Sequence, residues 1–172
     1  MTRIRFDVVT PEHRYPLSRR DALDALSHAW GGEPGLRDAI RSVRFGCNRD
    51  TTQEGRIVQN GSRFDIRINF CLTDGQSRQI STSPSWMRPV LACGGVLEPE
   101  TGSVTWSEPA ARSYAAFILF HELAHVVYLR RSGASAFEGK GGSDEERFCD
   151  DWAVRMLRRW TRSGVETQPE SA

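Results

Sequence analysis

The stretch 115–129 constrains the fold of this chain more than any other part of the sequence. Its residues are apolar on nearly every face of a helix, but His121, Glu122 and His125 lie at its centre. The stretch is shorter than the roughly 20 residues that a membrane-spanning helix requires. We therefore predict a helix in the core of a globular domain, with these three polar side chains inside the protein.

The sequence also marks the two ends of this helix. Ser107 is suited to the N-cap, and Glu108 and Pro109 are both favoured in a first turn. The apolar pattern then continues to Arg130 and Arg131, two cations that suit the C-terminal end of a helix dipole. These signals predict one helix of about 22 residues.

His121 and His125 are four residues apart, so a helix presents both imidazoles on one face. Two such nitrogens can bind one Zn²⁺ and leave room for a third protein ligand and a water molecule, whose pKa the metal lowers. Without a metal, burying these groups together would be costly unless each found a partner. We therefore predict a zinc site, with Glu122 as the base that accepts the proton of the water.

A second helix is predicted to begin at Ser143, after a glycine-rich loop. Glu146 and Asp150 lie one turn apart at the edge of its apolar face, which makes Glu146 the predicted third ligand and Asp150 a partner for a ligand histidine. Alternatives remain open. Glu146 could close a capping box with Ser143, Asp150 could be a solvated surface residue, and Glu145 would be the ligand if the helix began one residue out.

The stretch from His121 to His125 and the stretch from Glu146 to Asp150 resemble the HExxH and ExxxD motifs of gluzincins, the thermolysin-like zinc peptidases. The helix after Ser143 looks most like that of the compact ImmA/IrrE family and the minigluzincins. The resemblance covers residues 107 to about 160, with Cys149 and Asp150 where the family usually has alanine and asparagine. It implies zinc bound by His121, His125 and Glu146, with Glu122 as the general base and Asp150 supporting a ligand histidine.

The resemblance also implies a peptide or protein substrate. Few residues follow Glu146, so the subdomain that supplies transition-state donors in thermolysin-like enzymes is not expected here. A donor would then come from elsewhere in the chain, and the candidates are Tyr15, His13, His28 and Arg67.

The N-terminal part has weaker signals. We predict a strand over 4–9, a helix over 18–30 with Ser18 as its cap, and a second short helix over 36–43. The two helices could form a helix-turn-helix, but a helical cover on the core is favoured because such pairs are common in any fold.

The middle of the sequence, after residue 55, has patterns typical of β-strands. The segment 64–72 alternates as a half-buried strand, and Asn60-Gly61 suits a type I′ turn that joins it to a strand at 56–58. Further short strands are predicted at 90–93 and 104–106. If the strand from Phe64 to Phe70 lay at a sheet edge, it could pair with an extended substrate.

The composition indicates one globular domain, because 38% of the residues are hydrophobic and 26% are charged. We predict an α+β domain over 1–162, with an N-terminal helical segment, a small twisted sheet and two packed helices that carry the metal, followed by a disordered polar tail over 163–172. A net charge of +1 argues against nucleic acid and membranes as partners. Four scattered cysteines without a CxxC pair predict reduced thiols and a cytoplasmic protein.

The sequence suggests two other functions. Gly46-Cys47 invites comparison with peptide deformylase, but Ala124 stands where that enzyme has aspartate, and no Leu-Ser follows Cys47. A catalytically quiet zinc domain that binds a regulator or nucleic acid through its N-terminal helices is the more serious alternative. An open cleft at the metal would favour hydrolysis over this alternative.

Overall fold

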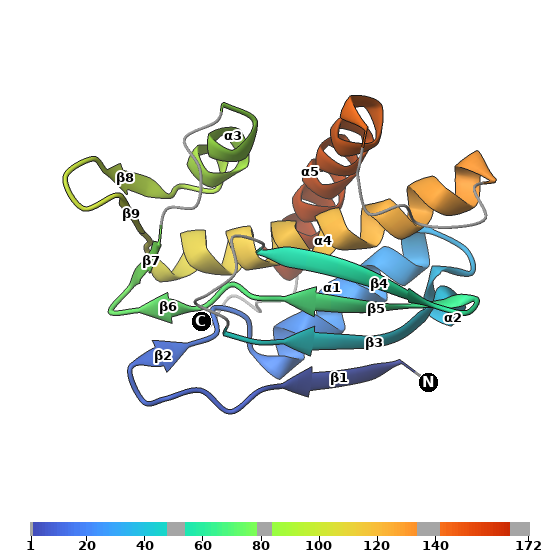
Figure 1. The fold of residues 1–172 in the computed structure, drawn as a ribbon, viewed down its shortest axis with the longest axis horizontal. Coiled ribbons are helices and arrows are strands. Elements are labelled where there is room, and N and C mark those ends of the chain that lie inside the picture. The colour runs from blue at the N-terminus through green and yellow to red at the C-terminus, as the bar shows by residue number, and fades with distance from the viewer. Residues whose placement is uncertain (1, 48–53, 79–83, 134–141, 166–172) are drawn as a thin grey trace, which may run out of the picture.

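The structure is a computed structural model, and it describes residues 2–47, 54–78, 84–133 and 142–165. In these residues the chain has a mixed α+β fold with two sheets and two long C-terminal helices that pack together (Figure 1). The predicted α+β class is confirmed at this level.

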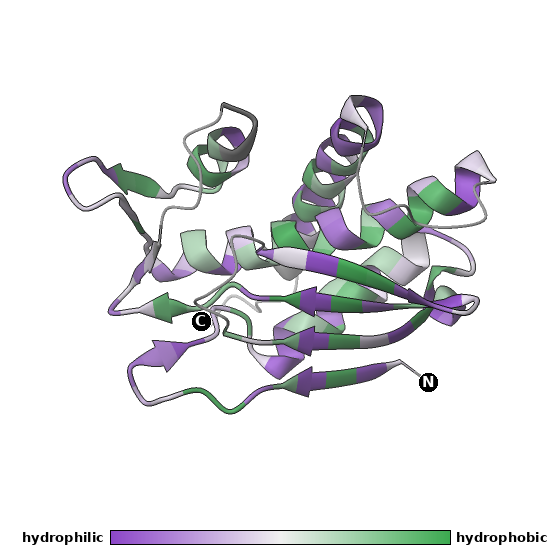
Figure 2. Ribbon diagram, in the orientation of Figure 1, coloured by the Kyte–Doolittle hydropathy of each residue, from purple (hydrophilic) through white to green (hydrophobic). Residues whose placement is uncertain are grey.

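The first sheet has the strand order β1-β3-β5-β4. β1, β3 and β5 are parallel to one another, and β4 is antiparallel to β5 at the edge. Polar and apolar residues alternate along these strands (Figure 2), so the sheet has one buried face. The strands are β1 (Arg3–Phe6), β3 (Ile40–Phe45), β4 (Gly55–Asn60) and β5 (Arg63–Ile68).

The hairpin between β4 and β5 is confirmed, but its turn lies one residue later than predicted. Asn60 pairs with Arg63, which leaves Gly61 and Ser62 in the turn. Gly61 has a φ of 61°, and among the described non-glycine residues only Asp74 has a positive φ. A glycine at the first turn position suits a type II′ turn rather than the type I′ turn that was predicted.

The second predicted helix is mostly strand. α2 spans only Leu36–Ala39, and the chain continues directly into β3. Ile40 and Val43 therefore belong to a parallel strand, where β-branched side chains pack well. The helix-turn-helix alternative is wrong for this reason.

The second sheet is antiparallel, with the strand order β2-β6-β7-β9-β8. The prediction of a single small sheet is thus incomplete. The strand predicted at 104–106 corresponds to β9, but the one predicted at 90–93 overlaps a helix, α3 (Pro84–Ala92). The strands are β2 (His13–Arg14), β6 (Leu72–Thr73), β7 (Gln76–Arg78), β8 (Val96–Glu98) and β9 (Ser103–Thr105).

α4 (Glu108–Ser132) is the buried helix that the sequence predicts. Ser107 caps its first turn through the backbone N–H of Ala110, and Gly133 ends it in the left-handed conformation. α4 contacts β4 and β5 on one side and packs against α5 (Ser143–Val165), as Figure 1 shows. No helix among the described residues is long and apolar enough to cross a membrane.

α1 (Arg19–Gly32) completes the helical side of the fold. Ser18 and Asp21 form a capping box at its start. The indole N–H of Trp160 in α5 donates to Asp24 of α1 at 2.7 Å. This bond fixes the C-terminal helix to the N-terminal one. α5 continues to Val165 and so extends into the segment predicted as a tail, whose residues 166–172 lie outside the described part.

Cys47 and Cys71 form a disulfide, so the prediction that all four cysteines are reduced is wrong for this pair. The pairing follows from the register of two neighbouring strands. Phe45 at the end of β3 lies opposite Ile68 at the end of β5, and each cysteine follows within three residues. This proximity arises from the parallel sheet, which the spacing of cysteines along the sequence does not show.

Candidate metal centre

α4 and α5 bring two imidazoles and a carboxylate together. The Nε2 atom of His121 lies 3.4 Å from Oε2 of Glu146, and the Nε2 atom of His125 lies 3.8 Å from Oε1 of Glu146. Ligands of one tetrahedral zinc ion, with bonds of about 2.0–2.1 Å, lie about 3.3 Å apart. The donor atoms of these three residues are all within 4.8 Å of one another. The cluster therefore has the chemistry and the spacing to hold a metal ion.

A second carboxylate lies behind each imidazole. Nδ1 of His121 is 3.0 Å from Oδ1 of Asp150, and Nδ1 of His125 is 2.7 Å from Oε1 of Glu145. A protonated Nδ1 that donates to a carboxylate leaves Nε2, which points toward Glu146, as the nitrogen that can bind a metal once the ring has lost its second proton. Both rings are thereby held in the tautomer that a metal on the Glu146 side requires.

The sequence does not predict the contact between Glu145 and His125. The sequence suggests Glu145 only as a substitute ligand, whereas its carboxylate faces the Nδ1 side of His125 and Glu146 faces the Nε2 side of both rings. α5 begins at Ser143, which is therefore a helical residue and not the N-cap that a capping box requires. The capping role for Glu146 does not fit this arrangement.

His121, Glu122 and Glu146 border a cleft of about 310 Å³. The carboxylate of Glu122 is nearly buried, with 8% of the residue exposed, while half of the Glu146 side chain is exposed. The cleft is thus open to solvent at Glu146 and closed behind Glu122. It is lined by Glu54, Gly55, Pro89, Tyr114, Phe117, Ile118, His121, Glu122, Glu146 and Asp150.

The start of β4 forms one wall of this cleft. Gly55 packs directly against Glu122, and its neighbour Glu54 accepts a 2.5 Å hydrogen bond from the hydroxyl of Tyr114 in α4. Tyr114 is two turns before His121 on the same helix and is fully buried. This bond ties the edge strand to the helix that carries the histidines.

Burial and neighbouring charges shift the pKa values of the cluster. Burial raises the pKa of Glu122 to about 7, an effect that the positive charge on His121 opposes. Burial lowers the pKa of His121, but its hydrogen bonds to Asp150 and Glu146 outweigh burial and raise it to about 10. The same hydrogen bond from His121 lowers the pKa of Glu146.

The four residues considered as transition-state donors are not among the residues that line the cleft. Tyr15 donates to the backbone carbonyl of Asp7, and His13 lies beside the disulfide. His28 belongs to α1, and Arg67 belongs to β5. Tyr114 does line the cleft, and the sequence does not predict this because Tyr114 belongs to the buried apolar part of α4.

Cys47 does not belong to the cluster, because it is bonded to Cys71. This arrangement removes the remaining argument for a deformylase-like site, in which a cysteine would join the two histidines. Comparison with protein-family models, with curated proteins and with solved structures finds no match for this chain.

Proposed function

We propose that this chain is a zinc-dependent metallopeptidase of the gluzincin type, with His121, His125 and Glu146 as ligands. One observation carries the proposal: the Nε2 atoms of His121 and His125 lie 3.4 and 3.8 Å from the Glu146 carboxylate, and His121, Glu122 and Glu146 line an open cleft. The resemblance of the two sequence motifs to those of gluzincins, and of the compact ImmA/IrrE proteins among them, supports the same assignment.

Zinc, when bound, would lower the pKa of a water molecule and polarise the carbonyl of a substrate. Glu122 would accept the proton of that water and deliver it to the leaving amine. A general base works best when its pKa lies near the working pH. Burial raises the pKa of Glu122 in the metal-free protein, and the positive charge of a bound zinc ion would lower it again.

Asp150 and Glu145 act on the histidines and not on the substrate. Each accepts a hydrogen bond from the Nδ1 atom of one imidazole, so the ring cannot turn its Nε2 atom away from Glu146. Such contacts increase the affinity of a site for its metal.

An extended peptide would bind along β4. β5, which contains most of the strand considered as an edge, lies between β3 and β4, so it has partners on both sides and is excluded. β4 is the strand at the end of the sheet order, and Gly55 at its start lines the cleft. Backbone pairing with β4 would lead a substrate past Glu122.

The alternative is a zinc domain without catalysis. Structural zinc sites usually have four protein ligands, whereas catalytic sites have three and keep one position for water. The cluster in the described residues offers three ligands beside an accessible cleft. Both features support hydrolysis.

The test is hydrolysis of a fluorogenic peptide library by zinc-loaded protein, compared with Glu122→Gln. The amide keeps the shape of the side chain but cannot accept a proton. We expect equal zinc content and a rate lower by about 10²–10⁴-fold in the variant. Cleavage by the variant at the wild-type rate would show that Glu122 is not the base.

A further inference from the structure

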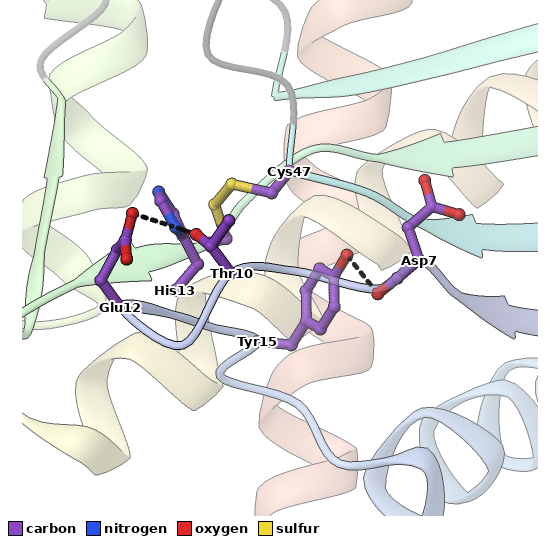
Figure 3. The surroundings of a disulfide bond; sticks show 7 residues. Asp7, Thr10, Glu12, His13, Tyr15 and Cys47 are labelled. Carbon is purple, nitrogen blue, oxygen red and sulfur yellow. Dashed lines mark hydrogen bonds and ion pairs between the residues drawn. A yellow bond between two sulfur atoms is a disulfide. The ribbon is translucent and has the colours of Figure 1, made fainter.

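A second cluster of metal-binding side chains lies outside the cleft. It consists of His13 in β2, Cys47 after β3 and Cys71 before β6, and their donor atoms are within 4.8 Å of one another. Figure 3 shows His13 beside the disulfide. The three residues are partly buried, and only 6% of the His13 side chain is exposed.

We infer that His13, Cys47 and Cys71 form a second metal site, which binds one Zn²⁺ when the Cys47–Cys71 disulfide is reduced. Two thiolates and one imidazole are ligands that zinc prefers, and they leave one tetrahedral position for a water molecule. The disulfide and the metal compete for the same two sulfur atoms. The oxidised protein therefore does not bind zinc here.

The backbone is compatible with this exchange. The Cα atoms of Cys47 and Cys71 are 5.6 Å apart. Two thiolates on one zinc ion, with Zn–S bonds of about 2.3 Å, lie about 3.8 Å apart, which the reduced side chains can reach by rotation about their χ angles. Both cysteines follow neighbouring strands of one sheet, so the strands hold them together when the disulfide opens.

His13 is oriented by its own neighbours. Its Nδ1 atom lies 2.6 Å from the hydroxyl of Thr10 and 3.9 Å from the carboxylate of Glu12. Hydrogen-bond partners on the ring of a histidine fix its orientation and strengthen metal binding. The ring thus sits beside both sulfurs before any metal arrives.

The exchange balances as a two-electron reaction. A dithiol reductant gives two electrons and two protons to the disulfide and becomes a disulfide itself, while Cys47 and Cys71 become thiols. Zinc then displaces the two thiol protons. In reverse, an oxidised dithiol takes up two electrons from the thiolates and two protons from water, the bond between Cys47 and Cys71 re-forms and zinc is released.

Cobalt titration tests the inference, because Co²⁺ substitutes for zinc and gives a thiolate-to-metal absorption band in the ultraviolet. The cleft cluster has no sulfur ligand, so this band reports only the second site. We expect His121→Ala protein reduced with a phosphine to show the band with one equivalent of Co²⁺, and the oxidised protein to lack it. The same contrast is expected without His121→Ala, so failure of the cleft proposal would not affect this test.

Variants identify the ligands. Cys47→Ser and Cys71→Ser should abolish the band. His13→Ala should weaken Co²⁺ binding by at least about 10-fold. Cys93→Ser is the control, because it alters a free cysteine, and it should leave both the band and the Co²⁺ affinity unchanged. No thiolate band in the reduced wild-type protein would overturn the inference. Unchanged affinity in His13→Ala would also overturn it, as would loss of native circular dichroism on reduction alone, because the site must be preformed.

Discussion

Gly55 lies so close to Glu122 that a Cβ atom added to the glycine would be 2.2 Å from Oε1 of the glutamate. The edge strand of the sheet and the buried carboxylate of α4 therefore touch, with no side chain between them. A substrate that pairs with β4 would pass directly beside this carboxylate.

Gly55→Ala should consequently impair peptide hydrolysis while zinc content stays normal. The added methyl group must displace either Glu122 or β4, and overpacking of this kind costs about 1–3 kcal/mol. Zinc analysis, peptide cleavage and urea unfolding measure the three effects. Gly31→Ala is the matched control, because nothing lies within 4 Å of its added Cβ. Normal cleavage by Gly55→Ala would show that this contact does not position the carboxylate.

His121→Ala and His125→Ala should each lose the metal of the cleft. A site with three protein ligands depends on every imidazole, and loss of one should weaken zinc binding by more than the 10–100-fold that loss of an outer partner costs. Zinc content after gel filtration checks this, with the Cys47→Ser/Cys71→Ser background used to remove the second site. Stoichiometric zinc in the double histidine variant would exclude the cleft as its location.

Glu145, Glu146 and Asp150 of α5 should differ in how strongly their loss weakens zinc binding. Glu146→Ala should lose zinc from the cleft, whereas Glu145→Ala and Asp150→Ala should retain it with an affinity about 10–100-fold lower, because they hold the imidazoles and not the metal. Asp144→Ala controls for the loss of a negative charge at the helix start, since Asp144 is exposed in the same turn. Isothermal titration with zinc gives all four affinities. Loss of zinc from Glu145→Ala alone would show that Glu145, and not Glu146, is the third ligand.

The metal-free protein should become less stable as pH rises. Glu122 and His121 have pKa values of about 7 and about 10 in the folded protein, above the ordinary 4.5 and 6.5. The folded state therefore binds more protons than the unfolded state, between pH 4.5 and 7 through Glu122 and between pH 6.5 and 10 through His121. The stability that these protons contribute is complete below pH 4.5 and is lost as pH rises.

Urea unfolding in the presence of a chelator, across about pH 5 to 9, measures this trend. Zinc affinity should change in the opposite direction and increase with pH, because the metal must displace the proton of His121. His121→Ala should flatten the upper part of the stability profile. An unchanged profile in that variant would mean that another group titrates there.

The cluster of His121, His125 and Glu146 could be anticipated from sequence because each residue lies on a helix with a strong amphipathic or apolar pattern, and helical spacing fixes which residues share a face. The segment that forms α2 and β3 was wrongly predicted as one helix, because Leu36, Ile40 and Val43 have helical spacing. Ile40 and Val43 instead belong to a buried parallel strand. Periodicity alone does not separate short buried strands from helices.

Contacts between distant segments were beyond local patterns. The disulfide depends on the register of β3 and β5, and the approach of Gly55 to Glu122 depends on how β4 lies against α4. The role of Glu145 depends on which side of α5 faces His125. A sequence predicts the first residue of a helix only to within about one or two positions, so it does not decide whether Glu145 or Glu146 faces the metal.

The bond between Trp160 and Asp24 joins residues 136 positions apart in the chain. Contacts across so long a separation slow folding, because loop-closure entropy must be lost before they form. α5, which supplies Glu146, packs mainly against α4, so the cluster of two imidazoles and a carboxylate is complete only when these two helices have come together. A metal ion held by all three side chains would therefore depend on the packing of α4 with α5.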